Sequence, residues 1–82
     1  FDAIIFPNPT SQYITIRIID SPVEISCIKL SDLYGALISE YTNINNNQIQ
    51  IELSALPKTG VYFIEICSPN KQKIWKKIMY IK

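Results

Sequence analysis

Hydrophobic and polar residues alternate in short runs along most of the chain. The clearest run is residues 12–19, in which isoleucines at every second position alternate with Tyr13, Thr15 and Arg17. A period of two places the isoleucines on one face of a β-strand, so this run predicts a strand with one buried side. No stretch has the period of an amphipathic helix, and the sequence therefore predicts an all-β protein.

Turn residues separate this run from further apolar runs of similar length. The run from residue 23 to residue 30 changes parity near Cys27, which predicts a bulge or a second buried face there. Six or seven strands at a spacing of about ten residues are typical of a small antiparallel β-sandwich. The other predicted strands are residues 3–6, 23–30, 36–41, 49–53, 61–67 and 71–81.

Prolines and glycines mark the turns between these strands. Pro7, Asn8 and Pro9 predict a rigid corner, because neither proline can donate a backbone hydrogen bond and Pro9 restricts the backbone of Asn8. Gly35 and Gly60 each precede a predicted strand and are expected to serve the turns that lead into it.

The composition predicts one small domain. The 82 residues are 48% hydrophobic and 18% charged, and 17 of them are isoleucine, which favours strands. We expect a single domain over residues 1–82, and we expect it to be part of a longer chain because it begins with Phe1 and not with methionine. The longest apolar runs have four residues, against about 20 for a membrane-spanning helix. No transmembrane segment or signal peptide is therefore expected within these residues.

The net charge of +1 conceals an asymmetry along the chain. Residues 1–70 carry three basic and seven acidic side chains, whereas residues 71–82 carry five lysines and no acid. Proteins that bind nucleic acid are generally basic, so we expect no nucleic-acid partner. Lysines on a last strand either protect an open sheet edge from aggregation or serve as a recognition signal.

The residue types needed for the common catalytic sites are missing. There is no histidine for a catalytic triad, and two glycines are too few for a phosphate-binding loop. Cys27 and Cys67 lack the CxxC spacing of a zinc ribbon, which leaves two buried thiols or one disulfide. The seven carboxylates are scattered singly. We therefore expect no enzyme activity, no catalytic residue, no metal ligand and no cofactor.

Residues 56–60 read LPKTG and match the LPxTG pentapeptide that Gram-positive sortases cleave. A cell-wall sorting signal also needs a membrane-spanning apolar stretch after the pentapeptide. The run that follows here has seven residues and contains Glu65, which is too short and too polar to span a bilayer. We therefore interpret the pentapeptide as a loop that leads into the next strand.

Four segments in order resemble one family, the type A C-terminal sorting domain of proteins exported by the type IX secretion system of Bacteroidota. The first is an aromatic residue followed by Pro-Asn-Pro at 6–10, and the second is an alternating strand that ends in glycine at 28–35. The third, at 51–64, is similar to the family pattern "dLs.Lp.G.Y", in which a dot stands for any residue, and the fourth is a basic strand at 73–78. The resemblance covers residues 3–82. The motif residues are Pro7, Asn8, Pro9, Gly35, Gly60, Tyr62, Lys73, Lys76 and Lys77.

The resemblance implies an immunoglobulin-like β-sandwich that serves as a secretion signal and not as a catalyst. The N-terminal cargo of the same chain would cross the inner membrane with its own signal peptide. The outer-membrane type IX translocon would then recognise the folded C-terminal domain in the periplasm. A sortase-like cysteine peptidase would cut upstream of the domain, and the cargo would reach the cell surface or the extracellular medium.

Two roles are expected for the motif residues. The prolines, Asn8, the two glycines and Tyr62 are expected to act through the turns and the core. Lys73, Lys76 and Lys77 are expected to form a charged face that is offered to the translocon, with residues 60–66 as packed support.

A second class of function is also compatible with the sequence. The domain could be an accessory carbohydrate-binding or adhesion module of a bacterial cell-surface enzyme. Exposed aromatic residues such as Tyr13, Tyr41 or Trp75 would then provide the platform on which a sugar stacks.

Overall fold

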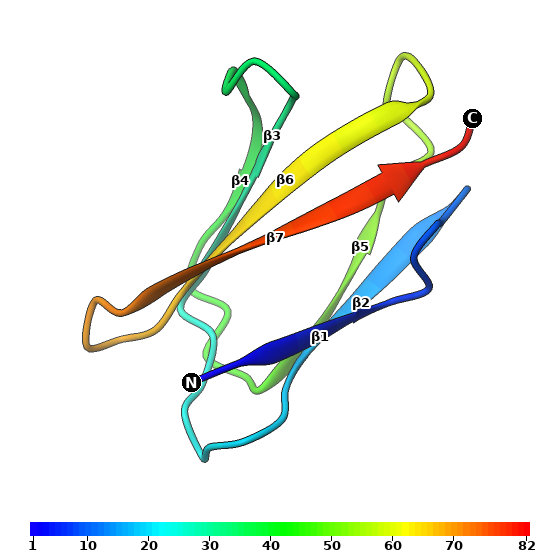
Figure 1. Ribbon diagram of the computed structural model, residues 1–82. Helices are drawn as coiled ribbons and strands as arrows, with labels where there is room; N and C mark the ends of the chain where they lie inside the picture. The colour runs from blue at the N-terminus through cyan, green and yellow to red at the C-terminus, as the bar shows by residue number, and fades with distance from the viewer.

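The structure, a computed structural model, describes residues 1–82 as seven β-strands in two sheets (Figure 1). The chain forms no helix that is long and apolar enough to cross a membrane. The all-β prediction is confirmed. The strands are β1 (Ala3–Phe6), β2 (Tyr13–Ile18), β3 (Cys27–Ser31), β4 (Leu37–Tyr41), β5 (Gln48–Glu52), β6 (Gly60–Cys67) and β7 (Lys73–Tyr80).

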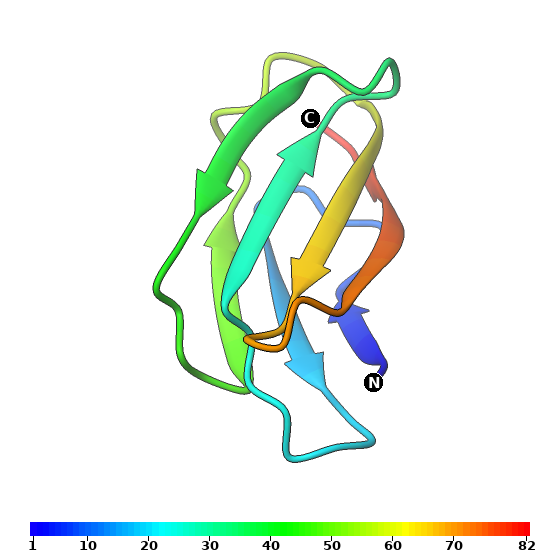
Figure 2. The same ribbon diagram turned by 90° about the vertical axis from the view of Figure 1, so that its left-hand side faces the viewer.

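The two antiparallel sheets pack face to face as a sandwich (Figure 2). One sheet has the strand order β1-β2-β5 and the other has the order β4-β3-β6-β7. This arrangement is that of a small immunoglobulin-like sandwich, the fold that the resemblance implied. β1 and β7 are edge strands of different sheets, and they lie along the same side of the molecule (Figure 1).

In β2, β3, β5, β6 and β7 the buried face of the strand is the face that carries its isoleucines, whereas Ile4 of β1 and Ile38 of β4 are 40% exposed. Ile14 and Ile16 of β2 and Ile64 and Ile66 of β6 are fully buried between the sheets, as the alternation predicted. They belong to a core of 15 hydrophobic residues to which both sheets contribute. Burial of each such side chain stabilises the fold by about 1.5–3 kcal/mol relative to its exposure to water.

The change of parity near Cys27 arises because the chain passes from one sheet to the other. Ile25 is buried, and its N–H donates a hydrogen bond to the carbonyl oxygen of Asn46 beside the three-stranded sheet. Cys27 then begins β3 and pairs with β6 without a break in register. The register shift in β3 lies at Leu30 and Ser31, against β4. The N–H of Ser26 donates to the carbonyl oxygen of Cys67 at 2.8 Å, and Cys67 is also the register partner of Cys27. Two consecutive residues thus face one where the chain enters β3, as in the predicted β-bulge.

Asp32 organises the turn between β3 and β4. Its carboxylate accepts hydrogen bonds from the N–H groups of Tyr34 and Ala36, both at 2.9 Å. Gly35 has a φ of +85°, a backbone conformation that residues with a Cβ atom rarely adopt. The turn therefore favours glycine at this position.

The positions of two side chains in the four-stranded sheet predict a large difference in how much their replacement by alanine lowers the free energy of unfolding. Ile64→Ala should lower the free energy of unfolding by about 2–5 kcal/mol, because it removes a fully buried side chain and leaves a cavity. Leu37→Ala, which removes an exposed side chain from β4, should change it by less than about 0.5 kcal/mol. Urea unfolding of the two variants measures both effects, and equal losses would contradict this assignment of the core.

Candidate functional site at the edge of the last strand

β7 is the edge strand of the four-stranded sheet, and β6 is its only strand partner. Its even-numbered residues face the core, where Ile78 and Tyr80 are buried, and its odd-numbered residues face outward. In an antiparallel strand the backbone groups of alternate residues point to opposite neighbours. The outer edge of β7 must therefore be paired by another segment or remain open.

The corner after β1 pairs with the second half of this edge. The side-chain amide of Asn8 donates to the carbonyl oxygen of Lys77 at 3.2 Å, and its side-chain oxygen accepts from the N–H of Met79 at 3.0 Å. The N–H of Thr10 donates to the carbonyl oxygen of Met79 at 2.9 Å, and its own carbonyl oxygen accepts from the N–H of Ile81 at 2.7 Å. We call Asn8 and Thr10 the clamp.

The prolines on either side of Asn8 reduce the number of backbone donors that need a hydrogen-bond partner at this corner. Pro7 and Pro9 have no N–H, so the corner leaves no unpaired backbone donor at these two residues. Both prolines follow cis peptide bonds. The hydroxyl of Thr10 donates to the carbonyl oxygen of Tyr13 at 2.6 Å, which connects the clamp to the start of β2. The Pro-Asn-Pro corner thus pairs an edge strand in addition to turning the chain.

The first half of the same edge has no backbone partner. The backbone N–H and C=O of Met79 point to the clamp. Because alternate residues of a strand point their backbone groups to the same edge, the N–H and C=O of Lys73 and Trp75 and the N–H of Lys77 also point there. No segment pairs with them there. The side chain of Trp75 is 61% exposed on the outer face. We call Lys73, Trp75 and Lys77 the free edge.

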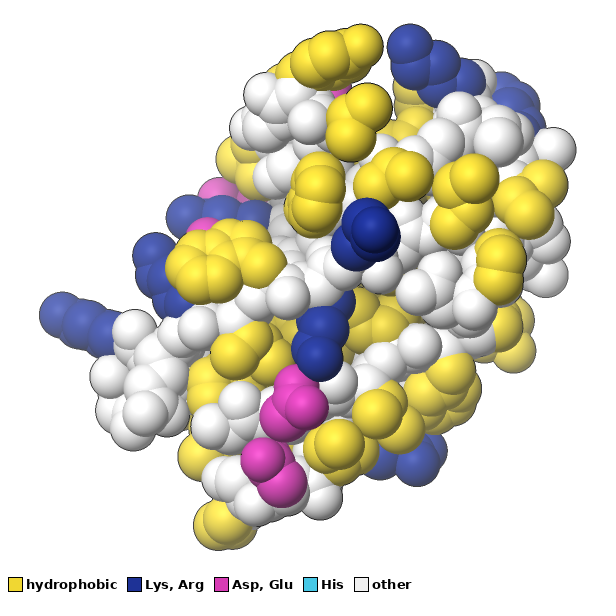
Figure 3. Space-filling view, in the orientation of Figure 1, with side chains coloured by type: hydrophobic (Ala, Val, Ile, Leu, Met, Phe, Trp, Pro, Cys, Tyr) yellow, Lys and Arg dark blue, Asp and Glu magenta, His cyan; other side chains and the backbone are white.

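The three lysines of β7 do not share one face, in contrast to the expectation of a single charged face. Lys73 and Lys77 point outward, whereas Lys76 lies on the core-facing side and forms an ion pair with Asp2, with 2.8 Å between Nζ and Oδ1. The reason is the period of two, which places adjacent residues on opposite faces. Figure 3 shows the basic side chains as separate groups with hydrophobic side chains between them.

The ion pair lowers the pKa of the Asp2 carboxyl below its ordinary value, mainly through the hydrogen bond from Lys76. The N–H of Ala3, which donates to the same carboxylate at 2.8 Å, lowers the pKa further. Asp2 directly precedes β1, so this contact joins β7 to the other sheet. Together with the clamp, it connects the two edge strands at two points.

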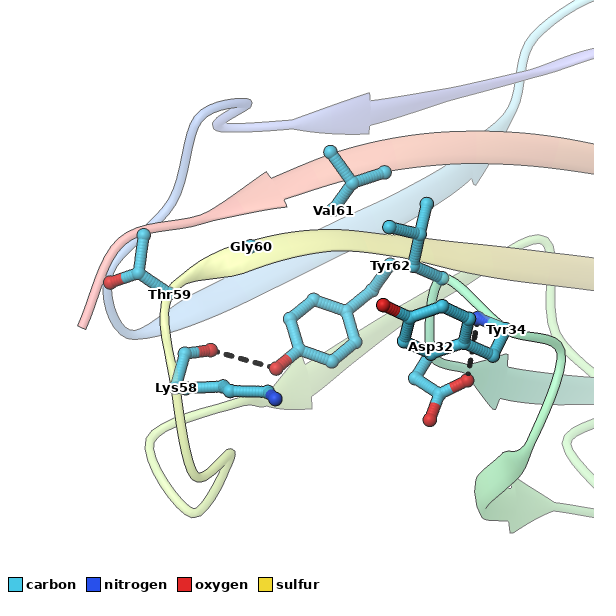
Figure 4. Close-up of a pocket in the computed structure, with 8 residues that line it drawn as sticks. Asp32, Tyr34, Lys58, Thr59, Gly60, Val61 and Tyr62 are labelled. Carbon is cyan, nitrogen blue, oxygen red and sulfur yellow. Dashed lines mark hydrogen bonds between the residues drawn. The ribbon is translucent and has the colours of Figure 1, made fainter.

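Tyr62 connects the loop at residues 56–60 to the last strand. Its hydroxyl donates to the carbonyl oxygen of Lys58 at 2.7 Å (Figure 4), and its ring packs edge-to-face against that of Tyr80. Leu56 of the LPKTG sequence is buried in the core. Gly60 lies at the start of β6, where an added Cβ would meet no atom within 4 Å. An added Cβ would meet no atom within 4 Å at Gly35 either, so the preference for glycine at Gly35 comes from its positive φ, and Gly60 shows no such preference.

A shallow pocket lies between this loop and the turn at Asp32 (Figure 4). Its volume is about 190 Å³, below the roughly 300–1,000 Å³ of typical small-molecule sites. Asp32 and Tyr62 line it, but both already form hydrogen bonds within the protein. The pocket therefore does not favour a small-molecule ligand.

The aromatic residues considered as a sugar platform lie on different surfaces. Tyr13 is in the three-stranded sheet, Tyr41 packs against the core, and Trp75 is on the outer face of the four-stranded sheet. These three aromatic residues therefore do not form one shared platform.

The match to a known family extends over almost the whole chain and includes the residues of the clamp and of the free edge. Residues 4–82 match the family described as the secretion system C-terminal sorting domain. The chain belongs to this family. The domain is thus a C-terminal sorting signal of type IX secretion, and it serves export to the cell surface or the extracellular space.

A similar protein is much longer than this sorting domain. The chain is 31% identical over 78 residues to a protein of Formosa agariphila named endo-acting ulvan lyase. The match covers 95% of this chain but 14% of that protein. This proportion fits a sorting domain attached to a larger cargo.

The ion pair of the sorting domain predicts a pH-dependent difference between two adjacent lysines. Near pH 7, Lys76→Gln should lower the urea midpoint of unfolding more than Lys77→Gln, because Lys76 pairs with Asp2 across the sheets. The pKa of Asp2 is lowered in the folded state, so the stabilisation is present above its ordinary value of 3.8 and is lost as the pH falls through the folded value. The difference should therefore become smaller as the pH is lowered below 3.8, and a difference that does not change with pH would contradict the ion pair as its cause.

The clamp predicts a loss of stability on removal of one exposed side chain. Asn8→Ala should cost about 1–2 kcal/mol, because two hydrogen bonds to the backbone of β7 are lost. Asn47→Ala is the matched control, since this exposed side chain forms no such bond. Urea unfolding measures both, and hydrogen exchange at the amide of Met79 should become faster only in the first variant. An unchanged exchange rate would show that Asn8 does not hold the strand.

Proposed function

We propose that the sorting domain directs its cargo through the outer-membrane type IX translocon and that the translocon recognises the free edge. The observation that supports this proposal is the combination of unpaired backbone groups, two outward lysines and an exposed tryptophan at Lys73, Trp75 and Lys77. An open strand edge binds an extended segment of a partner through main-chain hydrogen bonds. The side chains on either side of that edge then determine which partner binds.

The charge of the free edge suits an acidic partner. Lysine side chains steer the encounter with a negatively charged surface and contribute more to the rate and specificity of association than to its strength. The clamp holds the second half of β7, so the first half is presented by a fixed strand. A folded signal of this kind does not lose the ordering entropy that a flexible tail would lose on binding.

The domain itself is non-catalytic in this proposal. Its cargo precedes it in the same chain and passes through the periplasm before it crosses the outer membrane. A sortase-like cysteine peptidase then removes the domain by cutting upstream of Phe1. The name of the relative, endo-acting ulvan lyase, supports an enzyme as one kind of cargo.

Export of a reporter protein tests the proposal. The reporter carries a Sec signal peptide at its N-terminus and residues 1–82 at its C-terminus, in type IX-competent cells and in a translocon-deficient control. We expect the reporter at the surface or in the medium of the first and in the periplasm of the second. Retention in both, with the fusion shown to be folded, would contradict the proposal and favour a carbohydrate-binding or adhesion module.

Substitution of the outward lysines tests the role of the free edge. Lys73→Gln with Lys77→Gln should reduce export about tenfold, because two charged contacts of about 0.5–1 kcal/mol each would be lost. Lys58→Gln with Lys82→Gln is the matched control, because it removes the same charge at the opposite end of β7 from the free edge. Both variants should unfold at the urea midpoint of the unsubstituted domain. Equal export of the two variants would show that the lysines of β7 are not recognised.

A further inference from the structure

The two cysteines of the domain lie directly opposite each other on neighbouring strands. Cys27 is the first residue of β3, Cys67 is the last residue of β6, and the two are register partners in the antiparallel pair. They share the outward face of the sheet with Lys29 and Glu65, which are also register partners and form an ion pair at 3.8 Å. Both cysteines are free thiols in this structure.

The geometry of such a pair meets the requirement for a disulfide. Residues opposite each other on antiparallel strands have Cα atoms about 4.5–5.5 Å apart, and disulfides join Cα atoms about 4.4–6.8 Å apart. The side chains of a register pair also leave the sheet on the same face. The register of Cys27 and Cys67 therefore places them at a separation that a disulfide can span.

The two thiols also differ in exposure and interact with each other. Cys67 is 7% exposed, whereas Cys27 is half-buried and is the one that a reagent reaches. Burial raises the pKa of the Cys67 thiol to about 12, and the neighbouring Cys27 thiol is the next cause. The Cys67 thiol also donates to a carboxylate oxygen of Glu65 at 3.6 Å. Cys67 is therefore protonated at neutral pH, and its nearest reactive neighbour is Cys27.

We propose that Cys27 and Cys67 form a disulfide once the domain has left the cytoplasm, and that the structure described here is its reduced form. The location rests on the proposed function, because passage through the periplasm brings the domain into an oxidising compartment. The bond would close a loop of roughly 40 residues that contains β4 and β5, and it would fix the pairing of β3 with β6. β6 is the strand that supports β7, so the disulfide strengthens the part of the sheet that carries the free edge.

The oxidation proceeds by exchange with a disulfide of a small molecule or of a thiol–disulfide oxidoreductase. The thiolate of Cys27 attacks one sulfur of that oxidant, and a mixed disulfide forms while the other sulfur leaves as a thiolate. Cys67 loses its proton to water and attacks the Cys27 sulfur of the mixed disulfide. The Cys27–Cys67 bond then forms and the second sulfur of the oxidant leaves. The protein loses two protons and two electrons, and the oxidant is reduced to two thiols.

Incubation of the purified 82-residue chain with a mixture of oxidised and reduced glutathione tests the bond without any export step. We expect a loss of two hydrogens in the intact mass, a peptide in which Cys27 is linked to Cys67, and a rise in the midpoint of thermal unfolding of about 10 °C or more. Addition of a dithiol reductant should reverse all three changes. The variant with Cys27→Ser and Cys67→Ser should show none of them while it retains the unfolding midpoint of the reduced protein within a few degrees.

Three results of this experiment would overturn the proposal. They are a persistent mixed disulfide of glutathione at Cys27, two free thiols after oxidation, and a linked peptide whose formation leaves the unfolding midpoint unchanged or lower. The same chain expressed with and without a Sec signal peptide, with its free thiols alkylated before lysis, tests the compartment. A bridge in the periplasmic sample alone supports the proposal, and free thiols there overturn it. Because neither assay needs the type IX translocon, failure of the disulfide and failure of the sorting proposal are distinguishable.

Discussion

Hydrogen bonding between the Pro-Asn-Pro corner and the outer edge of β7 determines how the rest of the domain is arranged. The clamp forms because the corner between β1 and β2, which are both in the three-stranded sheet, reaches the edge of β7 in the four-stranded sheet. The ion pair between Lys76 and Asp2 connects the same two edge strands nearer the start of β1. The sandwich is thus closed along this side by polar contacts, while the isoleucines hold the two sheets together from within.

This closure divides the last strand into two parts with different properties. Its second half is paired on both edges, since β6 lies on one side and Asn8 and Thr10 lie on the other. Its first half is paired on one edge and presents Lys73, Trp75 and Lys77. An open strand edge is usually a liability for aggregation, and lysines are a common protection against it. In an export signal the same lysines also suit recognition, so protection and recognition do not exclude each other here.

Local periodicity was sufficient to predict which faces of the strands are buried. Alternation identified the inward residues of β2, β6 and β7, because the direction of a side chain in a strand depends only on its position in a period of two. The last strand was expected over residues 71–81 and is observed over Lys73–Tyr80. Contacts between distant residues could not be predicted in this way. Nothing in the sequence marks Asn8 as the partner of Met79 or Asp2 as the partner of Lys76.

The cysteines and glycines illustrate the same limit. Whether Cys27 and Cys67 face each other depends on the register between β3 and β6, which a single sequence does not reveal. Gly35 and Gly60 both precede strands and were both expected to serve turns, but only Gly35 adopts a positive φ. The pattern indicates that a turn is present, whereas the backbone angle of each glycine depends on how the two neighbouring strands are placed.

Photocross-linking in type IX-competent cells tests most directly whether the translocon binds the free edge of β7. A photoreactive amino acid replaces either Trp75 or Gln50, an exposed residue of β5 at the edge of the other sheet, in reporters that are still exported. We expect cross-links to an outer-membrane component of the translocon from position 75 and none from position 50. Cross-links from position 50 alone, or from neither position during active export, would contradict binding at the free edge.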